Sequence, residues 1–163
     1  MYFVDRERLA ETLSHMETLL EMFQKQKNWQ TPIEKLALER LVHVLVESFL
    51  DVGNQMIDGF IMRDPGSYED IVDILVDEGV VSKENEEGLK RVVQLRKILV
   101  RDYTRIQHDS LSAELKRFYE DWKAFPEQVR TYLDKELGPV SAFKPTKEWH
   151  RVKKYQGYLF DLD

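Results

Sequence analysis

The sequence of 163 residues has no cysteine, only five prolines and seven glycines, and no long apolar run. The absence of cysteine excludes a disulfide scaffold, a thiolate nucleophile and thiolate metal ligands. No window approaches the roughly 20 apolar residues that a membrane-spanning helix needs. The N-terminus is charged from Asp5 onward and has no apolar core. We therefore expect no membrane segment and no signal peptide, and a cytoplasmic protein.

Charge is distributed unevenly along the chain. The net charge of −6 argues against a general nucleic-acid coat protein. Residues 64–87 nevertheless carry nine acids and one base, whereas residues 90–107 carry six bases and one acid. The basic strip is either a solvated helix face that pairs with its acidic neighbour or a local surface for phosphate.

Apolar spacing predicts an all-α bundle of about five helices, with no competing strand pattern. Thr31, Ser67 and Ser82 are predicted N-caps, and Pro126 should kink or split the last helix. The second helix is apolar over a wide arc, which predicts either a central position or a helix that faces a partner as well as the core. The predicted helices cover residues 9–28, 32–62, 67–79, 82–106 and 112–137.

The domain organisation predicted from the sequence is a helical domain over residues 1–138 and a tail over residues 139–163. The tail begins as a basic linker and ends in the apolar run YLFDLD. This end resembles a truncated first strand of haloacid-dehalogenase-type phosphatases, and a chance apolar terminus is the alternative. We assign the tail no catalysis.

Three segments, ALERLVHVLVESFLDVGNQMI, RDPGSYEDIVDILVDEGVVS and GLKRVVQLRKILVRDYTRI, together resemble the HepT-like branch of the HEPN family. These are toxins that act beside an MNT-type nucleotidyltransferase antitoxin. The resemblance implies a homodimer that pairs through the second and fourth helices and cleaves RNA without metal. The family pattern of Arg, four residues, His, one residue and Tyr places Arg96 and Tyr103, but Arg101 stands at the histidine position.

The resemblance implies catalytic roles for Arg96, Arg101 and Tyr103, and it makes Tyr103 the site of AMP attachment by the antitoxin. Packing against the dimer partner is the alternative for Tyr103. Arginine can clamp a phosphate but cannot act as a base, since it stays protonated. A weakened ribonuclease is therefore expected, with a non-catalytic RNA-binding or partner-binding dimer, or a purely structural one, as the alternatives. The predicted RNA contacts are Lys97, Arg105 and Gln107.

Other polar residues add to the predicted site. Glu47, Asp51 and Asn54 form a stripe on the second helix that is either the floor of the site or an ion-pair seam between helices. His108 is a possible substitute base at the end of the fourth helix, whereas His43 is expected to be a core or interface histidine. We expect no metal and no cofactor.

Overall fold

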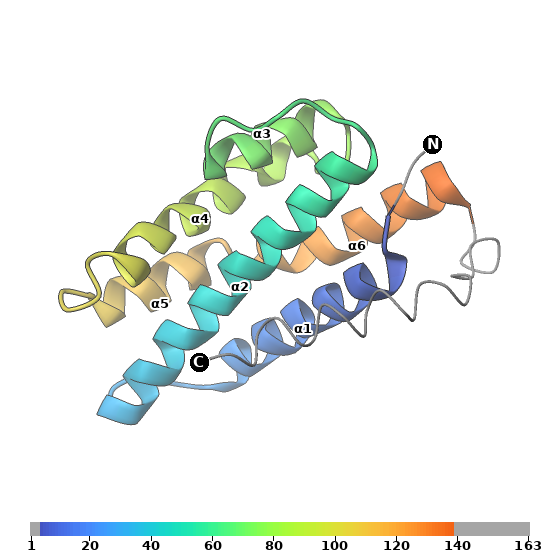
Figure 1. Cartoon of the computed structure of the whole chain (residues 1–163). Coiled ribbons are helices and arrows are strands. Elements are labelled where there is room, and N and C mark those ends of the chain that lie inside the picture. Colours follow the sequence, from blue (N-terminus) through green and yellow to red (C-terminus); the bar gives the residue numbers. More distant parts are fainter. Residues whose placement is uncertain (1–3, 139–163) are drawn as a thin grey trace, which may run out of the picture. The chain divides into compact units, whose positions relative to one another are not determined.

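The computed structural model describes residues 4–138, and these residues are helical without any strand. This confirms the predicted all-α class, although the count rises from about five helices to six (Figure 1). The elements are α1 (Arg6–Lys25), α2 (Pro32–Gly59), α3 (Tyr68–Asp77), the 3₁₀ turn η1 (Lys83–Asn85), α4 (Glu86–Val100), α5 (His108–Arg117) and α6 (Tyr119–Leu137). No helix in residues 4–138 is long and apolar enough to cross a membrane.

The chain divides into two compact units, residues 1–132 and 133–163. The described part of the second unit is the last turn of α6 and Gly138. The predicted tail, residues 139–163, lies outside the described residues, and its boundary at 138 remains a prediction.

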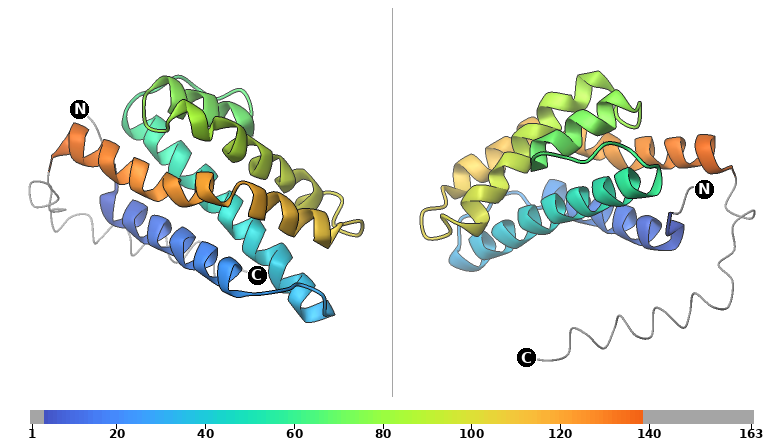
Figure 2. Two further views of the ribbon diagram at one scale, coloured as in Figure 1. Left: turned by 180° about the vertical axis from the view of Figure 1, so that it is seen from behind. Right: turned by 45° about the horizontal axis from the view of Figure 1, so that its top comes forward.

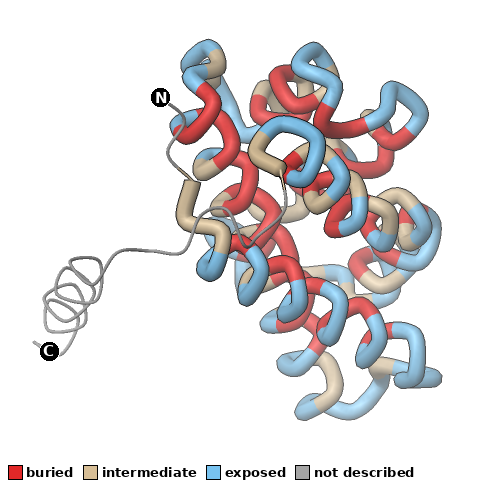
Figure 3. The backbone as a smooth tube through the Cα atoms, turned by 90° about the vertical axis from the view of Figure 1, so that its right-hand side faces the viewer, coloured by how far each residue is buried: buried red, intermediate tan, exposed pale blue. Residues whose placement is uncertain are grey.

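Helix α2 is the central element of the first unit, as its wide apolar arc predicts. It packs against α1, α3, α4 and α5. The tube in Figure 3 shows buried positions recurring along the helices. Phe49 of α2 lies between two aromatic rings of α6, with ring centroids 5.2 Å from Trp122 and 4.6 Å from Phe125. Trp122 is fully buried, and its indole N–H donates to the carbonyl of Gly88 at 3.1 Å.

The starts of α1, α2 and α3 follow local sequence signals, whereas η1, α4 and α5 begin without a side-chain capping bond. Thr31 and Glu34 form a capping box at α2, where Pro32 is the first helical residue. Ser67 caps α3 by accepting from the N–H of Asp70 at 3.1 Å. Ser82 precedes η1 rather than α4 and makes no such capping bond. The predicted cap at Ser82 is therefore wrong in its side-chain role.

Helix α4 ends at Val100, six residues before the predicted end. The N–H of the C-cap residue Arg101 bonds to the carbonyl of Lys97, and a turn follows in which Arg105 bonds back to Asp102. Asp102 disfavours continuation because a negative charge at a helix C-terminus opposes the helix dipole. Tyr103 and Thr104 also have modest helix propensity. The turn over residues 101–105 therefore leaves the helix axis (Figure 2).

The last predicted helix is split, but not at its proline. The break lies at Phe118, between α5 and α6, and α6 continues through Pro126. The carbonyl of Phe118 accepts from the N–H groups of Asp121 and Trp122 at 3.1 and 3.3 Å. These bonds satisfy backbone groups at the break while the Phe118 ring is buried. Pro126 therefore does not split the helix, and the alternative of a kink at this residue stays a prediction.

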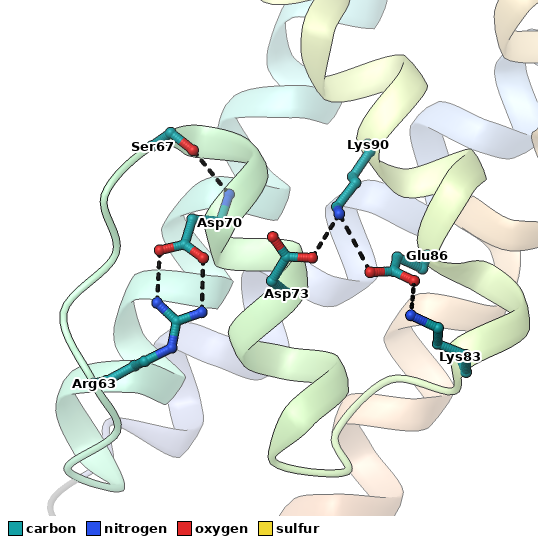
Figure 4. A network of polar contacts seen from close by, with 7 residues as sticks. All are labelled: Arg63, Ser67, Asp70, Asp73, Lys83, Glu86 and Lys90. Atoms are coloured by element: carbon teal, nitrogen blue, oxygen red, sulfur yellow. Dashed lines mark hydrogen bonds and ion pairs between the residues drawn. The ribbon is translucent and has the colours of Figure 1, made fainter.

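Part of the basic strip does pair with the acidic segment. Lys90 lies 2.5 Å from Asp73 and 3.2 Å from Glu86, and Lys83 lies 2.5 Å from Glu86 (Figure 4). Arg91 instead pairs with Glu114 of α5 at 3.5 Å. Pairing with the acidic neighbour, one of the two interpretations of the strip, thus holds for its N-terminal end only.

Asp70 is a strongly held carboxylate of the same region. Arg63 binds it in a bidentate pair with both distances at 2.7 Å (Figure 4). The N–H of Gly66 also donates to Asp70, at 2.8 Å. The Arg63 hydrogen bonds, followed by that from Gly66, lower the pKa of Asp70 from 3.8 to about 2. The folded state therefore binds the ionised carboxylate better than the unfolded state does.

We expect this carboxylate to stabilise the loop before α3 above pH 4 and to lose that effect as the pH falls towards 2. The Asp70→Asn protein should have a lower Tm than the wild type at pH 6, and the difference should shrink between pH 4 and pH 2. Thermal unfolding across this range measures the effect. A difference that is constant with pH would mean that ionisation of Asp70 is not involved.

Candidate functional site

An ion pair between α2 and α4 anchors the arginine of the predicted motif. Arg96 Nε lies 2.5 Å from Glu47 Oε1, and both side chains are partly buried. The hydrogen bond to Glu47 raises the pKa of Arg96 above its ordinary value, and burial opposes this more weakly. Arg96 is thus a permanent, positioned cation. Its contact with Glu47 uses the Nε donor, whereas four of the five guanidinium N–H donors belong to the two Nη atoms.

Tyr68 supports the same guanidinium from a third helix. It is the first residue of α3, and its ring centroid lies 4.6 Å from the guanidinium carbon of Arg96. Such stacking holds the planar group in one orientation. Tyr68 itself is 47 % exposed. Tyr68 was not among the residues predicted from the sequence.

His43 joins this cluster through Glu47. Its Nε2 lies 3.6 Å from Glu47 Oε1, the same oxygen atom that Arg96 contacts. The two residues are four apart on α2, so they share one face of the helix. The imidazole is about one-third exposed. The arrangement gathers a cation, a carboxylate, an imidazole and a phenol from α2, α3 and α4.

The rest of the predicted polar stripe faces other neighbours. Asp51 accepts from Arg8 of α1 at 3.4 Å and from Gln55 at 3.3 Å, and Asn54 is exposed. Glu47 and Asp51 thus form ion pairs to different helices, as the seam alternative expects. They also border one hollow of about 480 Å³ between α1 and α2. The role of the stripe as a site floor remains a prediction.

The second half of the motif lies in the turn after α4. Arg101, Tyr103 and Arg105 are all exposed there, with Tyr103 at 65 %. The spacing of seven residues would place Tyr103 on the same face as Arg96 if the helix continued, but α4 ends at Val100, before Tyr103. Lys97 is exposed in the last turn of α4, and Gln107 is exposed at the start of α5. The structure therefore separates a partly buried anchor, Arg96, from an exposed basic turn.

His108 is not at the end of the fourth helix, as predicted, but is the first residue of α5. Its Nε2 lies 2.9 Å from Glu39 Oε2 of α2. Both side chains are largely buried, and the pair ties α5 to α2. Within residues 4–138, no three His, Asp or Glu side chains gather in a way that could hold a metal ion.

The helical fold and the anchored arginine before a basic turn are in keeping with the HEPN resemblance of the sequence, and known proteins that match the chain show its family. The chain belongs to the HepT-like family, because the sequence model described as "Ribonuclease HepT-like" matches residues 9–129. It is 50 % identical over 144 residues to the Bacillus subtilis (strain 168) protein named "Putative RNase YutE", which covers 88 % of this chain and 100 % of that one.

Solved structures show the same fold. The B. subtilis YutE structure, described as that of a cytosolic protein of unknown function, matches with a TM-score of 0.85 over 88 % of this chain and 100 % of its own. A tri-AMPylated Shewanella oneidensis HEPN toxin in complex with its MNT antitoxin matches with a TM-score of 0.66. That likeness has 17 % identity over 76 % of this chain and 96 % of the toxin, so it shows the fold alone.

Proposed function

We propose that this protein is the ribonuclease-toxin-type subunit of a toxin–antitoxin module and cleaves RNA without metal, weakly because Arg101 replaces the motif histidine. The observation that carries the proposal is the anchored Arg96. Glu47 fixes its Nε edge and Tyr68 fixes its plane, so its Nη groups are oriented before any ligand arrives. A planar guanidinium with a free edge is suited to bind a phosphate in a bidentate way.

The exposed basic turn extends this phosphate site in the proposal. Arg101 and Arg105 add cations, with Lys97 one turn earlier on α4 and Gln107 as a hydrogen-bonding group at its far end. Tyr103 has a π-face on which an unpaired base can stack. Phosphate contacts fix the strand, and stacking favours single-stranded RNA over a duplex.

The working unit in this proposal is a homodimer in which the second and fourth helices of two copies bring their motifs together. Val100 supports it, because this apolar residue is 39 % exposed at the end of α4, next to the basic turn. An MNT-type nucleotidyltransferase is the proposed second partner. Tyr103, 65 % exposed, is the proposed acceptor of AMP, by analogy with the AMPylated HEPN toxin.

The test is RNA cleavage in EDTA by the wild-type protein and by Arg96→Ala. The variant should cleave at least tenfold more slowly, because hydrogen bonds to a charged group contribute about 1.5–3 kcal/mol. Arg91→Ala is the matched control: Arg91 is also on α4 but pairs with Glu114. Equal cleavage by Arg96→Ala and wild-type protein would contradict the proposal.

Arg101 favours a second candidate function, a dimer that binds RNA without cleaving it. This function predicts no cleavage in EDTA but an RNA affinity that falls steeply with salt and weakens in Arg96→Ala. RNA binding measured between 50 and 200 mM salt distinguishes it from a scaffold, for which the Arg96 substitution makes no difference.

A further inference from the structure

We propose that His43 is the general base of this site and takes the proton that the missing motif histidine would take. The inference rests on the proposed ribonuclease function. It arises from the contact geometry rather than from the motif, since His43 lies 53 residues before Arg96 in the sequence.

The shared oxygen of Glu47 places His43 beside the phosphate-binding arginine. Arg96 Nε and His43 Nε2 contact Glu47 Oε1 at 2.5 and 3.6 Å. Arg96 Nε and His43 Nε2 therefore lie close to each other, because their separation cannot exceed the sum of these two distances. Because these two nitrogens face Glu47, the Nη edge of Arg96 is left for a phosphate oxygen and Nδ1 of His43 is left for the neighbouring 2′-hydroxyl of the same ribose–phosphate unit.

The other three residues of the cluster, Glu47, Arg96 and Tyr68, each have a defined role in this arrangement. The Glu47 carboxylate orients the ring and offsets the charge that it gains with a proton, as a carboxylate does beside other catalytic histidines. The Nη groups of Arg96 stabilise the charge that builds up on the phosphate. Tyr68, half-exposed and stacked against the guanidinium, offers a surface for one base.

The reaction step is a transesterification. The imidazole of His43 removes the proton of the 2′-hydroxyl, O2′ forms a bond to phosphorus, and the bond from phosphorus to O5′ breaks. The products are a 2′,3′-cyclic phosphate and a 5′-hydroxyl end, whose O5′ takes a proton from water. The hydroxide that remains takes the proton from His43, which restores the base. No oxidant, reductant or metal enters the balance.

The other described histidines are less suited to this role. His108 is bound to Glu39, which lies eight residues before Glu47 and so about 12 Å away along α2. His15 is on α1 and borders the same hollow as Glu47, but it makes no ion pair with that carboxylate among the described residues. Of the histidines within residues 4–138, His43 alone contacts the carboxylate that holds Arg96.

The experiment compares the wild type, His43→Ala and the control His108→Gln in EDTA, with and without added imidazole. The expected result is an approximately 10²-fold slower cleavage by His43→Ala, partial rescue by imidazole, and little change in His108→Gln. Affinity for a 2′-O-methyl RNA, which binds but cannot react, should change less than twofold. This last measurement separates a lost base from a lost fold or a lost binding site.

Two other outcomes have distinct meanings. If the wild type cleaves and His43→Ala cleaves equally well, or if imidazole gives no rescue, the assignment of His43 is overturned while the ribonuclease function stands. If the wild type does not cleave at all, the proposed ribonuclease function fails, and the role of His43 fails with it.

Discussion

Replacing Arg101 by histidine should raise the rate of RNA cleavage in EDTA by about 10²-fold. Arginine stays protonated at every usable pH, whereas histidine exchanges a proton near neutrality. General acid–base catalysis is typically worth 10²–10⁴-fold, and in our proposal His43 supplies only the lower part of that range. Arg101 is exposed at the C-cap of α4, so the smaller imidazole fits there without repacking the core.

The matched control for this gain is Arg101→Lys. This substitution also shortens the side chain, but lysine supplies no base near neutral pH. It should leave the cleavage rate within a few-fold of the wild-type rate. A rise in Arg101→Lys as large as that in Arg101→His would mean that removing the guanidinium, and not adding a base, is what matters. If the cleavage rate rises in neither variant, the result counts against the proposed ribonuclease function.

The double variant His43→Ala, Arg101→His relates the two histidine positions. If both imidazoles serve the same 2′-hydroxyl, the new histidine compensates for the lost one and the double variant cleaves at least as fast as the wild type. If they serve different steps, the two effects combine independently. The outcome therefore reports whether His43 substitutes for the motif histidine or acts at another point.

The fold was largely predictable because its helices carry strong local signals. The buried positions of α1 recur at three- and four-residue spacing, and α2 begins with a complete capping box. The end of α4 was not predictable in the same way. The apolar pattern continues to Ile106, and only the low propensity and unfavourable charge of residues 102–104 mark the stop.

The site was predictable only where it follows the chain. Arg96 and the basic residues after it stand in one stretch, so the motif identifies them. Tyr68 is brought to Arg96 by the packing of α3 on α4, which no local pattern indicates. His43 carried a usable signal, its four-residue spacing from Glu47, but its meaning depends on Glu47 contacting Arg96.

Replacing Trp122 by alanine should lower the free energy of unfolding by about 3–5 kcal/mol, the usual cost of truncating a buried aromatic side chain. The ring is fully buried and packs against Phe49 of α2. Its N–H bond to the carbonyl of Gly88 also ties α6 to α4. The substitution thus opens a cavity where three helices meet and removes the buried donor bonded to that carbonyl.

Denaturant unfolding at one fixed protein concentration measures this loss, because dimerisation would make the apparent stability depend on concentration. Trp122→Phe is the control: it keeps most of the ring packing and removes the indole donor, so a smaller loss of about 1–2 kcal/mol is expected. Equal losses in both variants would assign the effect to the hydrogen bond rather than to the cavity.

Because α2 carries both Phe49 and Glu47, loosening this core should also loosen the anchor of Arg96. Trp122→Ala should therefore weaken RNA binding even at temperatures where the protein remains folded.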